Sequence, residues 1–335
     1  MIKVLSIYLL VIVIAFTTVF SSTANNFLIQ KIYAHIFTLD DTASFLAFAD
    51  QLRVESQLVK TNLINNNLSL AEKHANKAAA LLTPNVEEEI AEKNQKTADD
   101  LLIAVGDLQK ISSSSEKQRQ MVDQLISRIN STLGEAVKAR IEEGQGSSSS
   151  TFLEKGIEFL GGIFGGGGSS SKNTDEGIKP NSTPNSTTQA LAFANLVDGI
   201  LVNYGNAYAV DFDMTNMSNM VMGGNSMAMS NNNSNNMNMS SSMMNMDSEN
   251  KKYTLADMTD YQSAQALATK AQEIFNGELK SIASNKSSAF ITNLESGLTQ
   301  LNNLIENKAS PMDIMMVVHT QIHPNLLAAY NLKLR

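Results

Sequence analysis

The chain has 335 residues, of which 43% are hydrophobic, 6% aromatic and 17% charged, with a formal net charge of −8 and no cysteine. This length is enough for one large domain or two ordinary ones, and an apolar set dominated by Ala and Leu favours helices over sheets. The lack of cysteine excludes disulfides, thiolate metal sites and cysteine nucleophiles, and the acidic balance without a basic patch argues against nucleic acid as a partner.

The first 24 residues have the pattern of a signal peptide. Lys3 precedes the apolar stretch 4–20, and small residues follow up to Ala24. The alternative is an uncleaved N-terminal anchor, because this stretch is just long enough to span a membrane. Cleavage after Ala34 instead would make His35 a mature N-terminus able to chelate Cu(II). In each case we expect the rest of the chain to be extracytoplasmic, either secreted or in the cell envelope.

Residues 40–143 carry the apolar periodicity of four helices with short connections, which is typical of a helical bundle. Ser69 and Glu72 predict a capping box for the second helix, and Pro84 predicts the first turn of the third. The predicted helices run from Asp40 to the Asn-rich stretch 65–67, from there to Leu82, from Pro84 to Ile111, and from Glu116 to Glu143.

The segment 144–188 is rich in Gly, Ser and Asn and is predicted to be a linker. One apolar piece, 152–164, interrupts it and is expected to dock on a bundle or touch a membrane. The pattern of the first half then returns in 189–335. "FLAFADQL" at 45–52 is echoed by "ALAFANLV" at 190–197, an offset of 145.

The three later helices align at a second common offset, 193, which pairs Leu101 with Leu294 and Leu133 with Leu326. A shared offset across three helices indicates an internal duplication, so we predict an all-α protein made of two tandem four-helix halves. The offset grows by 48 residues between the first and second helices of the second half. The segment 211–253 is therefore an insertion at a helix–helix corner, and we expect it to be a disordered loop.

Methionine dominates this insertion. Eleven of the 35 residues in 213–247 are Met, whereas the linker 144–188 has none, so a general codon bias does not explain them. Thioether sulfur is neutral and soft and selects Cu(I) or Ag(I) over Zn²⁺ or Mg²⁺. With three sulfurs to an ion, the segment would hold about three ions. The predicted ligands are Met214, Met217, Met220, Met222, Met227, Met229, Met237, Met239, Met243, Met244 and Met246.

"MTNMSNMVM" and "MNMSSSMMNM" resemble the Met motifs of extracytoplasmic copper-handling proteins, including the ectodomains of copper transporters and periplasmic copper-resistance proteins. The resemblance covers about 35 residues, and it implies copper, as Cu(I), as the bound metal. Those motifs often include histidine, and this segment has none. The helical part is only loosely similar to the extracytoplasmic helical domains of iron permeases and imelysin-like proteins, whose H-x-x-E metal residues are not found here.

Two histidines form a second candidate metal site. His319 and His323 are four residues apart and so share one helix face, where two imidazoles can begin a copper, zinc or nickel site. The alternative is structural: His319 aligns with the predicted core residue Ile126, and His323 would lie at the surface. His74, which aligns with Leu267, is predicted to be structural.

The sequence therefore predicts an extracytoplasmic metal-binding protein that captures, buffers or delivers Cu(I), with a membrane copper transporter or cuproenzyme as partner. No catalytic motif is present, and we expect no enzyme. One alternative is a non-metal envelope interaction protein with glycosylated spacers, and another is an accessory subunit of a membrane copper enzyme. N-x-S/T sequons begin at Asn67, Asn130, Asn185, Asn216, Asn232, Asn238 and Asn285.

Overall fold

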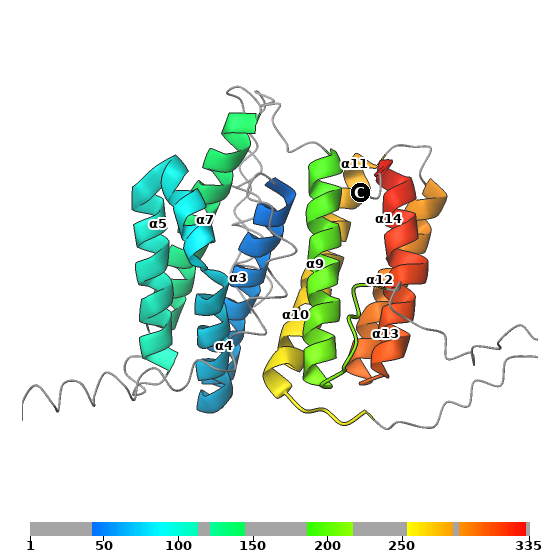
Figure 1. The fold of residues 1–335 in the computed structure, drawn as a ribbon, viewed down its shortest axis with the longest axis horizontal. Coiled ribbons are helices and arrows are strands. Elements are labelled where there is room, and N and C mark those ends of the chain that lie inside the picture. Colours follow the sequence, from blue (N-terminus) through cyan, green and yellow to red (C-terminus); the bar gives the residue numbers. More distant parts are fainter. Residues whose placement is uncertain (1–41, 113–120, 145–185, 217–252, 284–287, 333–335) are drawn as a thin grey trace, which may run out of the picture.

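The computed structural model describes residues 42–112, 121–144, 186–216, 253–283 and 288–332, and the regular elements in these ranges are all helices (Figure 1). The prediction of an all-α protein is confirmed. The predicted signal segment, most of the linker, His35 and ten of the eleven predicted methionine ligands lie outside the described residues. None of the helices in the described ranges combines the length and apolar character needed to cross a membrane.

Four helices of the first half form a closed bundle in which each helix packs on the next and the last returns to the first. Its core contains large apolar side chains from every helix, among them Phe48, Leu101 and Ile129, all nearly inaccessible to solvent. The helices are α3 (Thr42–Ile64), α4 (Leu68–Leu81), α5 (Pro84–Ser112) and α7 (Val122–Gly144).

The predicted capping box of the second helix is wrong. The N-cap of α4 is Asn67, whose side chain accepts a hydrogen bond from the amide of Leu70. The chain reaches it through Asn66, at φ 57°, a left-handed conformation that asparagine tolerates better than most residues. The three asparagines at 65–67 are thus the whole connection between α3 and α4, and the N-cap of α4 lies two positions before Ser69.

A kink in α5 was not predicted. Asn94 has non-helical angles (φ −159°, ψ 100°) in the middle of this helix. Its side chain accepts a hydrogen bond from the amide of Thr97, at 3.2 Å, so it caps the second segment of α5. Asparagine makes this bond readily, which is why it favours helix starts over helix interiors.

The second half also forms a closed bundle around its own core. Two of its helices contain a π-helical turn, a local widening that is often found at functional sites. Its elements are α9 (Ser186–Ala207), α10 (Met258–Ile274), η3 (Phe275–Leu279), α11 (Lys280–Ile282), α12 (Ser288–Glu306), α13 (Pro311–Val317), η5 (Val318–Ile322) and α14 (His323–Tyr330).

Pairs of residues related by the offset of 193 occupy equivalent core positions. Leu101 and Leu294 are both fully buried, as are Leu133 and Leu326. Two bundles of the same helical plan could also share such positions by packing rules alone, so the internal duplication stays a prediction.

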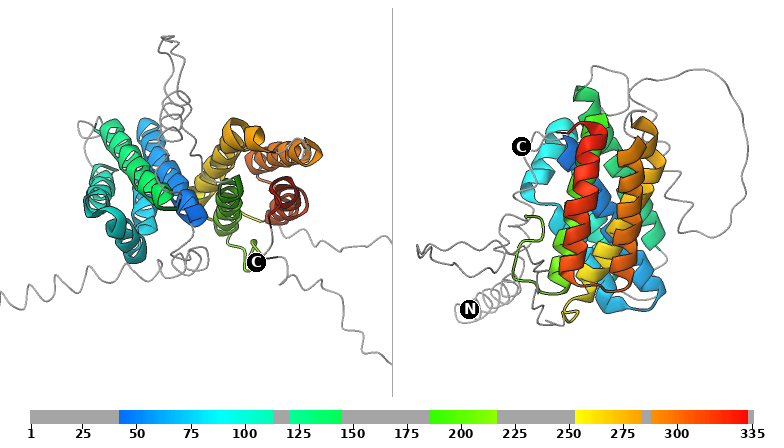
Figure 2. Two further views of the ribbon diagram at one scale, coloured as in Figure 1. Left: turned by 90° about the horizontal axis from the view of Figure 1, so that it is seen from above. Right: turned by 90° about the vertical axis from the view of Figure 1, so that its right-hand side faces the viewer.

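The two bundles pack side by side, with α3 against α9 and α10, as seen from above in Figure 2. Gly199 lies at this contact on α9, where an added Cβ would be 3.0 Å from Nε2 of Gln51 on α3. A glycine here lets the two helices approach closely. The interface is also where most buried polar side chains of the described residues meet.

Candidate metal centre

The methionine-rich insertion begins and ends at one closed corner of the second bundle. The carbonyl of Ala207, the last residue of α9, accepts hydrogen bonds from the amides of Ala256 (2.7 Å) and Asp257 (3.1 Å). Asp257 then caps α10 by accepting from the amide of Thr259 at 2.6 Å. The residues before and after the insertion are thus joined by backbone hydrogen bonds, independently of what lies between them.

The first residues of the insertion fold back onto the bundle. Met214 is only 3% exposed and belongs to the apolar core, and its sulfur lies 3.0 Å from where a Cβ on Gly205 would be. A glycine at 205 makes room for this side chain. In this structure Met214 packs as an apolar residue, a role that methionine often has. The remaining predicted sulfur ligands, from Met217 to Met246, lie outside the described residues.

The two predicted histidines lie together beside this root of the insertion. The rings of His319 and His323 are 5.2 Å apart between centroids and inclined by 77°. The expectation that His319 would be buried is wrong: both histidines are partly exposed, because η5 places them at the edge of the core rather than in it. The sequence thus correctly placed the pair on one face of the helix.

Nε2 of each histidine faces an oxygen atom, and only Nε2 of His319 is hydrogen-bonded to it. Nε2 of His319 lies 2.9 Å from the carbonyl oxygen of Met214, and Nε2 of His323 lies 3.4 Å from Oδ1 of Asp198 on α9. Burial and the charge of Asp213 raise the pKa of Asp198 to about 7. Burial and His319 lower the pKa of His323 to about 4, so this imidazole is neutral at pH 7.

No three His, Asp or Glu side chains converge as a metal cage within the ranges that the structure describes. A site built only from hard or borderline ligands is therefore not formed by these residues. Soft thioether ligands are a separate class, and they are what the sequence pattern favours.

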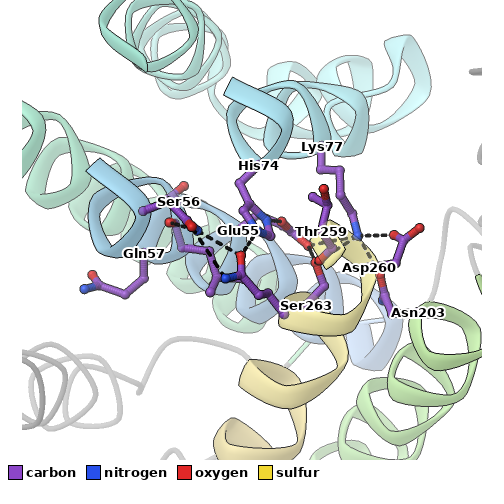
Figure 3. Close-up of polar contacts among 12 residues, drawn as sticks. Glu55, Ser56, Gln57, His74, Lys77, Asn203, Thr259, Asp260 and Ser263 are labelled. Atoms are coloured by element: carbon purple, nitrogen blue, oxygen red, sulfur yellow. Dashed lines mark hydrogen bonds and ion pairs between the residues drawn. The ribbon is translucent and has the colours of Figure 1, made fainter. Parts of the chain in front are cut away.

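A second polar constellation lies between the two bundles and was not predicted from the sequence (Figure 3). Glu55 on α3 is 4% exposed and accepts from Nδ1 of His74 at 2.7 Å and from the hydroxyl of Ser263 at 2.6 Å. Lys77 lies 3.5 Å from Glu55 and donates to Asp260 (2.7 Å) and Asn203 (2.6 Å). The network therefore joins α3 and α4 of the first bundle to α9 and α10 of the second.

Hydrogen bonds across the interface also hold the side chain of His74 from its other ring nitrogen. Asn62 donates to the carbonyl of Leu58 and to Oε1 of Gln262, both at 2.9 Å, so that Oε1 is an acceptor. The same Oε1 lies 2.9 Å from Nε2 of His74, whose Nδ1 faces the carboxylate of Glu55. Both ring nitrogens of this fully buried histidine therefore face oxygen atoms of Glu55 and Gln262.

This network is built for packing rather than for a substrate. Burial alone would raise the pKa of Glu55, but Lys77 and the bonds from His74 and Ser263 outweigh it and hold the pKa below its usual value. The cavity beside Glu55 and Lys77 measures about 10 Å³, which is no larger than one water molecule. A satisfied buried network of this kind specifies how the two bundles dock.

An acidic cluster lies at the same interface, and it involves α3 and η3. Burial and the carboxylate of Asp50 raise the pKa of Glu278 to about 7, against a smaller opposing effect of Lys270 and Arg53. Burial also raises the pKa of Glu273, next to the same groups. The interface thus contains one hydrogen-bonded network around Glu55 and one cluster of acidic side chains around Glu278.

Comparison with known proteins adds no assignment: no protein-family model, curated protein or solved structure matches this chain.

Proposed function

We propose that this protein binds Cu(I) outside the cytoplasmic membrane through the methionine-rich segment 217–246, and captures, buffers or delivers the ion. The observation that carries the proposal is the density of thioethers in one insertion, ten between Met217 and Met246, in a chain without cysteine. Methionine has no proton to lose near neutral pH and keeps its affinity where a thiolate would be oxidised. A Cu(I)-selective site of this composition suits an oxidising compartment.

Two features of the fold support the proposal. The helical body has complete cores of its own, to which Met214 alone of the eleven predicted ligands contributes in the described residues. The corner from which the insertion leaves is closed by the bonds of Ala207. A segment attached in this way can gather around metal ions without altering the bundle.

The decisive test is a pair of variants. One replaces residues 217–252 by a short Gly/Ser connection and keeps the anchored residues up to Asn216. The other keeps the full length and replaces the ten methionines from Met217 to Met246 by leucine. Both are titrated with Cu(I) under anaerobic conditions against a competing chelator, beside the unaltered protein.

We expect the unaltered protein to bind about three ions through the insertion, at three sulfurs per ion, and both variants to lose that binding. Helical circular dichroism should stay unchanged in each, since the bundle cores are intact. The leucine variant separates sulfur chemistry from segment length. Equal metal binding by all three proteins would place the bound ions outside the segment, and a lack of binding by all three would favour the non-metal interaction protein.

A further inference from the structure

Two methionines and two histidines that could bind a metal lie within twelve residues of the last helix, outside the insertion. Met312 and Met316 share one face of α13, and the rings of His319 and His323, which follow across η5, lie 5.2 Å apart. Met312 and Met316 are 37% and 43% exposed, whereas Met315 between them is fully buried in the core. Met315 fills the core, and packing does not explain the two exposed thioethers.

The contacts of the two histidines engage Nε2 and leave Nδ1 of each ring for another ligand. A carbonyl oxygen only accepts, so Nε2 of His319 carries the proton that it donates to Met214, and Nδ1 is the nitrogen whose lone pair can bind a metal. Nε2 of His323 lies 3.4 Å from Oδ1 of Asp198 without a hydrogen bond between them. No group in the described ranges bonds Nδ1 of either ring. Metal-binding histidines typically have this arrangement, with the second nitrogen held by a carbonyl or a carboxylate.

The backbone and the surrounding charge suit a cation. The π-helical turn η5 contains His319, and the amide of His323 bonds to the carbonyl of Val318, five residues back. The two imidazoles lie edge to face across this wider turn, with their centroids 5.2 Å apart. The carboxyl group of Asp198 faces His323 from α9, and Asp213 precedes Met214 at the root of the insertion.

We propose that Nδ1 of His319, Nδ1 of His323 and the sulfur of Met316 form a site for one Cu(I) ion on the folded bundle. Two imidazoles and one thioether are a ligand set that Cu(I) and Ag(I) accept and that hard cations do not. The site touches the insertion, because the carbonyl of Met214 holds His319. It deepens the proposed function, on which the choice of metal rests: ions gathered by the insertion would pass to a fixed site at its root.

In the test, the full chain is titrated with Ag(I), which is redox-inert. NMR signals of the histidine rings and the methionine methyl groups are recorded during the titration. We expect the ring signals of His319 and His323 to shift with added Ag(I), and those of His74, buried between the bundles, to stay in place. Signals are assigned with the variants His319→Gln and His323→Gln. Unmoved histidine signals while the methionine methyls shift would overturn this site and leave the proposed function standing.

The third ligand is tested by Met316→Leu, which changes an exposed side chain and should fold normally. We expect its histidine sites to bind Ag(I) at least about tenfold more weakly, the scale seen when groups that support a metal site are removed. Met121→Leu is the matched control, because Met121 is equally exposed but lies beside α7 in the other bundle. Equal affinity of both variants would exclude Met316 as a ligand.

The NMR titration also separates the two proposals in the other direction. If the ring signals of the histidines shift and the methyl signals of the insertion do not, the site is retained and the proposed function is contradicted.

Discussion

Replacing Glu55 with alanine is expected to lower the free energy of unfolding by about 3–5 kcal/mol, the cost of breaking a buried ion pair from one side. The substitution leaves Nδ1 of the fully buried His74 without its partner, and it leaves the hydroxyl of Ser263 with the carbonyl of Thr259 as its acceptor. Lys77 would keep Asp260 as a partner, so the loss falls mainly on the contact of α3 with α4 and α10. Urea unfolding followed by circular dichroism measures the change.

Two comparisons make this prediction specific. Ser263→Ala removes one hydrogen bond of the same network and should cost about 1 kcal/mol. Asp107→Ala removes the exposed partner of Lys110 and should cost less than about 1 kcal/mol, as surface ion pairs generally do. If Glu55→Ala were as mild as Asp107→Ala, the bonds of Glu55 would contribute little to the docking of the two bundles.

Replacing Glu278 with glutamine is expected to stabilise the protein at pH 8 and to have little effect at pH 5. The folded protein raises the pKa of Glu278 from 4.5 to about 7, so it holds a proton there that the unfolded chain releases. The stability tied to this proton is present below pH 4.5 and is lost as the pH rises through 7. Each pKa unit corresponds to about 1.36 kcal/mol, and partial exposure of the side chain reduces the sum to roughly 2 kcal/mol.

The measurement is a urea midpoint at both pH values for the unaltered protein and the variant. The difference between the two proteins isolates Glu278 from every other titrating group. Asp50→Asn is an independent check, because it removes the carboxylate that helps to raise this pKa and should reduce the pH dependence without touching Glu278. A difference that does not change between pH 5 and pH 8 would contradict the assignment.

Periodicity in the sequence predicted the helices and much of the core. Leu101, Ile129 and their counterparts in the second half repeat at helical spacing, and apolar burial enforces that spacing strongly. Local chemistry decided the details that periodicity misses. Asn67 rather than Ser69 caps α4, and Asn94 breaks α5, because asparagine side chains compete for backbone amides.

The network between the bundles could not be assembled from the sequence, since its partners come from distant segments. Glu55 and Ser263 are 208 residues apart and meet only because α3 docks on α10. One signal was present: His74 aligns with Leu267, so a polar residue occupied an expected core position. Met214 is the opposite case. The composition of the segment predicted that its sulfur is a metal ligand, and only the structure shows that this side chain packs against Gly205 in the core.

The bonds of Ala207 to Ala256 and Asp257 make the sulfur content of this chain adjustable independently of its fold. Closing a flexible loop becomes only about 0.6 kcal/mol more costly with each doubling of its length. Chains with one, two or three copies of residues 217–252 should therefore share one helical body and differ in metal capacity. The number of methionines inserted at this corner can therefore change, in evolution or by design, while the two bundles stay the same.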